Sequence, residues 1–254
     1  MKCLIINGSP HKGNTWALVE VVKSYMSKLG EVTFEEIHLS KLDIPMCLGC
    51  NTCFFKGENK CPHSSLIQPI AEKISASDCV IITSPSYSLA LSATCKNFID
   101  HMSYNFHRPR FFTKKMLVIS TTAGAGSDSI TKYIRDVFKF WGFNDGYRIS
   151  LSCFSSSGYK PTAKVIKKCE SIADKFYKDV TTKKMHPATL KRIFYYNVWR
   201  SMSLAGTPEE NMDNHYWLET GMRDMAFYKE IKIGILKKGF GNFIYGIMRK
   251  FMYS

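Results

Sequence analysis

Short apolar runs alternate with longer amphipathic runs over residues 1–180, and this alternation constrains the fold more than any other feature. The short runs have the length of strands. The longer runs repeat apolar residues at helical spacing, as Trp16, Val19, Val22 and Met26 do. Helices between successive strands require a parallel sheet that is covered on both faces. Right-handed crossovers favour the strand order 2-1-3-4-5. The sequence therefore predicts a three-layer α/β/α sandwich around a five-stranded parallel sheet.

The same pattern predicts where each element lies. Strands are expected at Lys2–Asn7, Val32–His38, Cys79–Ser84, Lys115–Thr121 and Tyr147–Cys153. Helices are expected between and after them, at Asn14–Leu29, Leu66–Ser75, Ala93–Ser103, Asp128–Trp141 and Pro161–Thr181.

The alternation stops near residue 185, so we expect a domain at 1–184 and a C-terminal helical extension at 185–254. Thr207-Pro208-Glu209-Glu210 predicts a helix start, because Thr caps helices and Pro and acids suit the first turn. Apolar residues at spacings of three and four between Phe240 and Phe251 predict a final helix. This aromatic tail is expected to be a packed subdomain or the arm of a homodimer or homotetramer. A third alternative is a basic helix that lies on an anionic membrane.

The composition excludes several classes of protein. Lys and Arg exceed Asp and Glu by 35 − 21 = 14, but the basic residues are spread along the chain. Without a nucleic-acid-binding motif, this charge favours a basic surface that attracts anionic cofactors, and no nucleic acid partner is expected. No apolar run reaches the roughly 7–15 residues of a signal peptide or the roughly 18–20 of a membrane span. We therefore expect a soluble cytoplasmic protein with no transmembrane segment.

The loop after the first strand is a candidate phosphate site. It reads Gly8-Ser9-Pro10-His11-Lys12-Gly13-Asn14-Thr15 and leads directly into a helix, whose first N–H groups and dipole attract an anion. The loop matches neither a P-loop nor a dinucleotide Gly-x-Gly-x-x-Gly motif. By itself it fits an ordinary strand–helix turn equally well.

Two further loops favour a ligand site over an ordinary strand–helix turn. Ser84–Leu89 follows the third strand, and Thr121–Ser127 follows the fourth. In an open α/β sheet, loops at the carboxyl ends of neighbouring strands meet at the point where the strand order reverses, and ligands bind there. Small hydroxyls, the ring of Tyr87 and Gly-rich backbone suit a flat heterocycle.

These loops, with Lys96–Asp100, resemble the flavodoxin-like NAD(P)H-dependent FMN reductases, and most strongly their iron–sulfur flavoprotein branch. The resemblance covers roughly the first 180 residues. It implies FMN as a noncovalent cofactor and NAD(P)H as a co-substrate. Reduced flavin would then pass electrons to a quinone, another flavin or an iron–sulfur partner. Because the cofactor carries this chemistry, no catalytic side chain is expected.

The resemblance also implies which residues hold FMN. The phosphate would lie at the first loop, where His11 stands in place of the Arg of many relatives: Ser9, His11, Lys12, Asn14, Thr15 and Trp16. The second loop would contact the isoalloxazine ring and ribityl chain through Pro85, Ser86, Tyr87, Ser88 and Leu89. The third would close over the other side through Thr121, Thr122, Ala123, Gly124 and Gly126.

Two other classes of function stay open at this stage. One is a non-enzymatic electron carrier of the flavodoxin or iron–sulfur flavoprotein type. Flavodoxins are typically strongly acidic, so the charge of +14 disfavours it. The other is a regulatory module that uses the same scaffold without flavin.

Four cysteines are clustered in the long loop after the second strand. Cys47, Cys50, Cys53 and Cys61 have the spacing Cys-x2-Cys-x2-Cys-x7-Cys. Four thiolates at this spacing can hold a 4Fe–4S cluster or a tetrahedral zinc ion, and reduced thiols without metal are the third alternative. The iron–sulfur branch of the resembling family favours the cluster.

The segment His101–Arg110 is basic and aromatic. We expect it to be a solvated basic turn. The alternative is a patch near the flavin edge that attracts the phosphates of NADPH or an anionic substrate.

Overall fold

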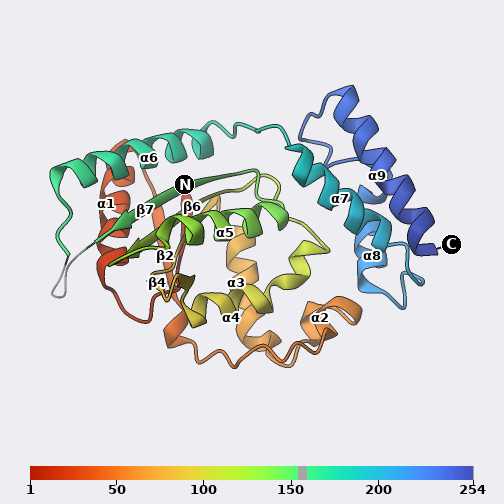
Figure 1. Cartoon of the computed structure of the whole chain (residues 1–254), viewed down its shortest axis with the longest axis horizontal. Helices are drawn as coiled ribbons and strands as arrows, with labels where there is room; N and C mark the ends of the chain where they lie inside the picture. The colour runs from red at the N-terminus through yellow and green to blue at the C-terminus, as the bar shows by residue number, and fades with distance from the viewer. Residues whose placement is uncertain (154–158, 254) are drawn as a thin grey trace.

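In the residues that the computed structural model describes, 1–153 and 159–253, five parallel strands form one sheet (Figure 1). They are β1 (Lys2–Asn7), β2 (Thr33–His38), β3 (Cys79–Thr83), β6 (Lys115–Thr122) and β7 (Asp145–Ser152). Their order in the sheet is β2-β1-β3-β6-β7. This is the order predicted from the sequence, and the flavodoxin-like fold class is confirmed.

Helices cover both faces of the sheet. They are α1 (Asn14–Leu29), α3 (Ser64–Ala76), α4 (Ala93–His101), α5 (Ser127–Phe140) and α6 (Ala163–Thr181). Each end of these helices and of the sheet strands agrees with its expected position within two residues.

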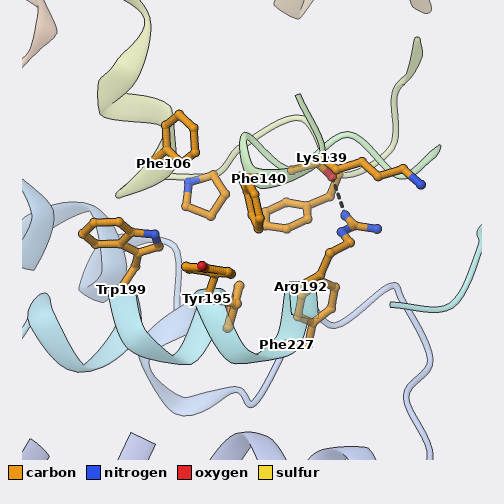
Figure 2. A pocket seen from close by; sticks show the side chains of 11 residues that line it. Phe106, Lys139, Phe140, Arg192, Tyr195, Trp199 and Phe227 are labelled. Atoms are coloured by element: carbon orange, nitrogen blue, oxygen red, sulfur yellow. Dashed lines mark hydrogen bonds between the residues drawn. The ribbon is translucent and has the colours of Figure 1, made fainter. Parts of the chain in front are cut away.

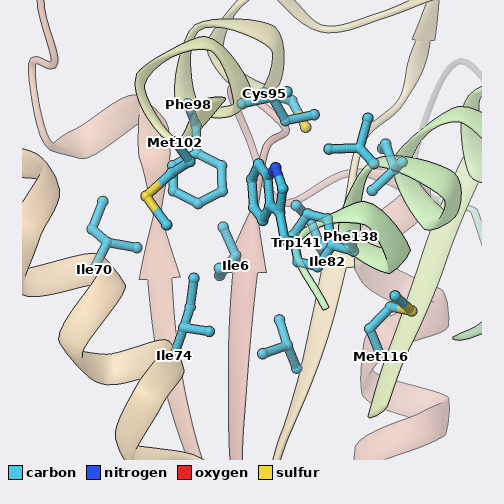
Figure 3. Packing of buried hydrophobic residues seen from close by; sticks show 14 of the residues in the cluster. Ile6, Ile70, Ile74, Ile82, Cys95, Phe98, Met102, Met116, Phe138 and Trp141 are labelled. Carbon is cyan, nitrogen blue, oxygen red and sulfur yellow. The ribbon is translucent and has the colours of Figure 1, made fainter. Parts of the chain in front are cut away.

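Alternating side chains of the strands pack into two cores. On one face, Ile6 and Ile82 pack with Phe98, Met102 and Trp141 against α3, α4 and α5 (Figure 3). On the other face, their strand neighbours, including Ile5 and Ile81, pack against α1 and α6. Because both faces are buried, the strands read as continuous apolar runs, as in β3 and β6.

Several short elements between the main strands and helices were not expected. β4 (Ser86–Tyr87) and β5 (Ala90–Leu91) form an antiparallel hairpin within the second ligand loop. The cysteine loop contains a one-turn helix, α2 (Thr52–Phe55), and a 3₁₀ turn, η2 (Glu58–Lys60). Two more 3₁₀ turns are η1 (Leu39–Lys41) and η3 (Ser103–Phe106).

The C-terminal extension lies beside the sandwich (Figure 1). It contains α7 (Leu190–Met202), α8 (Met212–Glu219), the turn η4 (Met222–Asp224) and α9 (Ile235–Tyr253), with α7 packed against α9. It has its own apolar cluster, which includes Tyr196, Trp217 and Phe227 and also Phe112 of the preceding domain. The final helix is confirmed. Part of its apolar stripe faces outward, since Phe243 and Phe251 are 63% and 82% exposed.

The predicted helix start at Thr207–Glu210 is wrong by one turn. These residues form an isolated turn, in which the Glu210 carboxylate accepts from the Thr207 amide at 3.3 Å. α8 begins at Met212 instead, because the Asn211 side chain accepts from the amides of Asp213 and Asn214. Asn is as good a helix cap as Thr, so the sequence contained two competing start signals.

Polar contacts hold the extension on the sandwich. Arg192 of α7 donates to the carbonyls of Asn144 and Gly142, at 3.0 Å each. The Asn144 side chain pairs with both backbone groups of His186. None of the helices in the described ranges has both the length and the apolar character needed to span a bilayer.

Candidate flavin site and cysteine cavity

A cavity of about 480 Å³ opens where β1, β3 and β6 end. Residues of all three predicted loops line it: Ser9, His11, Lys12, Gly13, Asn14, Thr15, Pro85, Ser86, Tyr87, Thr121, Thr122 and Ala123. Gly13 is the one lining residue that the sequence analysis did not select. Trp16, Ser88, Leu89, Gly124 and Gly126 were selected but lie outside the lining. The described lining residues include no carboxylate, so the charged groups of this cavity favour an anion.

The N-terminus of α1 faces this cavity with its amides uncapped. Gly13 precedes the helix without a side-chain hydrogen bond, and the fully described first turn has no acidic residue. Ser9 is buried, and its amide donates to the Asn7 side chain at 3.1 Å. Free helix N–H groups together with the helix dipole form an anion site.

Hydrogen bonds join the three loops to one another. The hydroxyls of Thr15 and Thr121 lie 2.6 Å apart and are buried. The carbonyl of Gly8 accepts from the hydroxyls of Ser92 and Thr94. A Cβ on Gly8 would lie 2.6 Å from the carbonyl oxygen of Thr83, so only glycine fits there. The loops therefore have a defined geometry that does not depend on a ligand.

Lys12 does not point freely into the cavity. Its ammonium lies 3.1 Å from the Glu36 carboxylate and 4.3 Å from the ring centroid of Trp16. The Trp16 ring thus packs against the ammonium group of Lys12. Burial alone would raise the pKa of Glu36, but hydrogen bonds from Lys23 and Lys12 outweigh it and lower this pKa to about 2. Glu36 therefore holds Lys12 in place and neutralises part of its charge.

The β4–β5 hairpin forms the wall opposite the phosphate loop. Its two turn residues, Ser88 and Leu89, have positive φ angles of 49° and 64°. Non-glycine residues in this region are strained, and such strain is concentrated at functional sites. The turn leaves Tyr87 45% exposed at the cavity. Ser86 ties the hairpin to the third loop by donating to the carbonyl of Ala125 at 2.9 Å.

The four clustered cysteines line a second, smaller cavity of about 40 Å³. Cys47, Cys53 and Cys61 are partly buried, whereas Cys50 is exposed. The structure thus brings together all four thiols that the sequence selected. His63 and His101 line the same cavity. The sequence analysis did not place them there, although the spacing Cys61-x-His63 was a signal for the first of them.

Two cysteines of this cavity have displaced pKa values. Burial, reinforced by the neighbouring Cys61, raises the pKa of Cys53 to about 11. Hydrogen bonds from Thr52 lower the pKa of Cys50. Cys50 is therefore the readier of the two to ionise.

Arg108 supports the cysteine loop from inside the protein. It is 1% exposed, and it donates to the carbonyls of Cys53 at 2.6 Å and Phe54 at 3.2 Å. Its charge is balanced by Glu58 at 3.0 Å and by Asp213 of α8. The expectation of a solvated basic turn is therefore wrong for Arg108. Two carboxylates far away in the sequence pair with this guanidinium and allow it to be buried.

A third space lies between the sandwich and the extension. Aromatic rings from both sides surround it, among them Phe140, Tyr195 and Trp199, and Arg192 bonds to a carbonyl beside it (Figure 2). Its volume is only about 20 Å³, close to that of one water molecule. We interpret it as a packing gap between the two parts.

A family model described as NADPH-dependent FMN reductase matches residues 1–151. This chain belongs to that family. The matched residues of this chain include the three loops around the larger cavity and the cysteine loop, and the C-terminal extension lies beyond them.

Several relatives of this FMN reductase family member are named iron–sulfur flavoproteins. One from Archaeoglobus fulgidus is 35% identical over 144 residues, which are 56% of this chain and 64% of the relative. One from Clostridioides difficile is 27% identical over 197 residues, 76% of this chain and 84% of the relative. The chain thus spans less than two thirds of the length of the archaeal relative.

Solved structures support the fold. The structure of an NADH:FMN oxidoreductase in its apo form matches this chain with a TM-score of 0.52 at 16% identity. The match covers 69% of this chain and 88% of the oxidoreductase. An oxidoreductase from Corynebacterium diphtheriae matches this chain with a TM-score of 0.53 at 16% identity. The match covers 72% of this chain and 99% of the oxidoreductase.

Proposed function

We propose that this protein is an FMN-dependent oxidoreductase that takes a hydride from NAD(P)H and passes the electrons to a small acceptor or a redox protein. The observation that carries the proposal is the cavity of about 480 Å³ that three hydrogen-bonded loops enclose at the carboxyl edge of the sheet. The family match and the names of the relatives support the same chemistry.

Each loop has its own task in this proposal. The uncapped amides of α1, with the hydroxyls of Ser9 and Thr15, bind the FMN phosphate. The hairpin from Pro85 to Leu89 positions the flavin ring, with Tyr87 beside it. Backbone from Thr121 to Gly126 provides N–H donors on the opposite side. When bound, the flavin supplies the hydride and electron chemistry, and the protein orients it and keeps water away from it.

We also propose that Cys47, Cys50, Cys53 and Cys61 hold a 4Fe–4S cluster. The donor set fits, because the four thiols line one cavity and such clusters are held by thiolates. The buried guanidinium of Arg108 lies behind the backbone of Cys53 and Phe54 and would offset part of the negative charge. A cluster there would relay single electrons between the flavin and an acceptor.

An absorption spectrum of anaerobically purified protein tests both cofactors. Flavin bands together with the broad absorption of an iron–sulfur cluster support the proposal, whereas a colourless protein that takes up no FMN contradicts it. Steady-state oxidation of NADPH or NADH then separates an enzyme from an electron carrier. A carrier would show almost none unless a partner reductase were added.

Replacing Cys50 by Ala tests the cluster separately. The variant should lose iron and sulfide but retain FMN, because Cys50 is exposed and outside the flavin cavity. Cys169→Ala is the matched control, since this thiol is buried on the opposite face of the sheet. Wild-type protein that contains no iron after anaerobic purification would contradict the cluster.

A further inference from the structure

Two histidines of the cysteine cavity have no role in the proposed function. His101, at the end of α4, is 4% exposed. Its Nε2 lies 2.9 Å from the carbonyl oxygen of Pro45. Because a carbonyl only accepts, Nε2 must carry the hydrogen, and in the neutral ring Nδ1 then has a free lone pair. Among the residues that the structure describes, this buried Nδ1 has no hydrogen-bond partner. A buried acceptor without a partner needs a physical explanation, and a bound ion or water molecule is one.

The orientation of His101 is fixed in advance. The carbonyl of Pro45 that receives its Nε2–H also accepts from Asn97 Nδ2 at 2.9 Å. Asn97 in turn accepts from the amide of Cys47 at 2.9 Å. The start of the cysteine loop and the imidazole are therefore held by one network. Metal-binding histidines commonly have this arrangement, in which the second ring nitrogen donates to a carbonyl.

His101 is close to two other potential ligands. One donor atom each from Cys61, His63 and His101 lies within 4.8 Å of the other two. The rings of His63 and His101 meet edge to face, with centroids 5.2 Å apart. Bonds of zinc to nitrogen and sulfur place tetrahedral ligands about 3.3–3.8 Å apart. Small side-chain rotations would bring the three donors to that spacing.

The surroundings also fit a single ion. The cavity of about 40 Å³ has room for an ion and a water molecule, since one water needs about 10–15 Å³ of such volume. Asp100, the carboxylate among the described lining residues, is already paired with Lys96 at 2.5 Å. The thiolate of Cys61 would then provide the negative charge of the first coordination shell.

We propose that Cys61, His63 and His101 form a mononuclear site for one divalent ion of the zinc type, with a fourth position open to water or to another thiol of the cavity. This site goes beyond the flavin chemistry and does not depend on it. It shares only Cys61 with the proposed four-cysteine cluster. A protein molecule therefore carries either the cluster or the single ion.

Cobalt binding in the Cys50→Ala variant tests this site, because the four-cysteine set is incomplete there. The FMN-loaded variant is stripped of metal with a chelator and titrated anaerobically with Co²⁺. We expect one equivalent to bind with the intense visible bands of tetrahedral Co²⁺ and a thiolate charge-transfer band. Adding His101→Ala should weaken binding by more than the about 10- to 100-fold that loss of a second-shell partner costs.

Two further variants keep the test decisive. His63→Ala removes a partly exposed ligand and should weaken binding in the same way without disturbing buried packing. His215→Ala, which removes an exposed histidine on α8, should leave cobalt binding unchanged. The flavin absorbance of each variant reports whether it is folded.

Unchanged cobalt affinity after loss of either cavity histidine would overturn the proposal, as would a weak six-coordinate spectrum. These readouts are separate from the oxidoreductase proposal. If the protein took up no FMN, the flavin proposal would fail, while cobalt binding could still be measured on the same sample with circular dichroism as the check on folding.

Discussion

The larger cavity and the cysteine cavity are built in different ways. The larger one is formed by short loops that leave β1, β3 and β6, and its shape follows from neighbouring strand ends and from the Thr15–Thr121 hydrogen bond. The cysteine cavity lies in a long excursion between β2 and α3. This loop depends on Arg108 and, through it, on Asp213 of the C-terminal extension.

This difference suggests a role for the extension. Besides the ion pair with Arg108, Asp213 accepts from His107 at 2.6 Å, and Trp217 donates to the carbonyl of His107 at 2.8 Å. α8 therefore holds His107 and Arg108 in place, and Arg108 in turn supports the cysteine loop. Among the described residues, none of the extension lines the larger cavity, which we propose binds flavin. Damage to this bracing should affect metal binding more than flavin binding, and the following predictions test that separation.

The largest effect is expected from Arg108→Ala. Removing the guanidinium leaves Glu58 and Asp213 without their buried partner, and breaking a buried ion pair costs about 3–5 kcal/mol. The midpoint of urea unfolding should fall accordingly. In the folded fraction of the variant, the clustered cysteines should react faster with a thiol reagent than they do in the wild type. This folded fraction should still bind FMN.

Arg148→Ala is the matched control for this prediction. Arg148 pairs with Asp128, which is 74% exposed, so its loss should change stability by no more than about 0.5 kcal/mol. Equal losses of metal and FMN in Arg108→Ala would contradict the separation of the two cavities.

The next effect is expected from Thr15→Val in the flavin cavity. The change keeps the shape but removes a buried hydroxyl from the anion site, and with it the bond to Thr121. A hydrogen bond to a charged group contributes about 1.5–3 kcal/mol, which corresponds to about 10- to 150-fold in affinity. FMN titration by fluorescence quenching measures the loss. Thr131→Val removes a buried hydroxyl of α5 outside the cavity and should leave FMN affinity unchanged.

A somewhat smaller effect is expected from Gly8→Ala. The new methyl group would lie 2.6 Å from the carbonyl oxygen of Thr83 and 2.7 Å from Cβ of Cys95, and neither can move away easily. Overpacking of this kind costs about 1–3 kcal/mol. Gly124→Ala is the control in the same cavity region, since no described atom lies within 4 Å of its added methyl group. Thermal unfolding should separate the two variants, and equal melting temperatures would contradict the close packing of the first loop.

The sequence predicted that the three loops meet, because strand ends determine where they lie. Once the strand order was known, the loops after β1, β3 and β6 had to meet, and most of their selected residues line one cavity. The β4–β5 hairpin was missed because it depends on the positive φ angles of Ser88 and Leu89, which are not typical residues for that conformation.

The cysteine cavity was predictable only in part. The spacing of the four cysteines indicated a common site. The burial of Arg108 was missed because its partners, Glu58 and Asp213, lie 50 and 105 residues away in the chain. His101 was missed as a cavity residue for the same reason, since only the folded loop brings it to Cys61. Long-range pairs of this kind leave no local pattern in a sequence.

The smallest effect is expected from Glu36→Gln, next to the flavin cavity. The pKa of Glu36 is lowered from its ordinary 4.5 to about 2. Its ion pairs therefore stabilise the wild type above about pH 4.5, and this contribution is lost as the pH falls towards 2. Because the side chain is 26% exposed, solvent screening limits the contribution to about 1 kcal/mol. The Gln variant should lack this part of the acid dependence in urea unfolding series.

The same substitution should act on the ligand in the opposite direction. Without the carboxylate, the Lys12 ammonium keeps its full charge beside the uncapped start of α1, so FMN should bind a few-fold more tightly at neutral pH. Glu35→Gln is the matched control, because Glu35 pairs with Lys73, outside the flavin cavity, at 2.7 Å. Weaker FMN binding in Glu36→Gln would mean that Lys12 serves the site by its fixed position rather than by its charge.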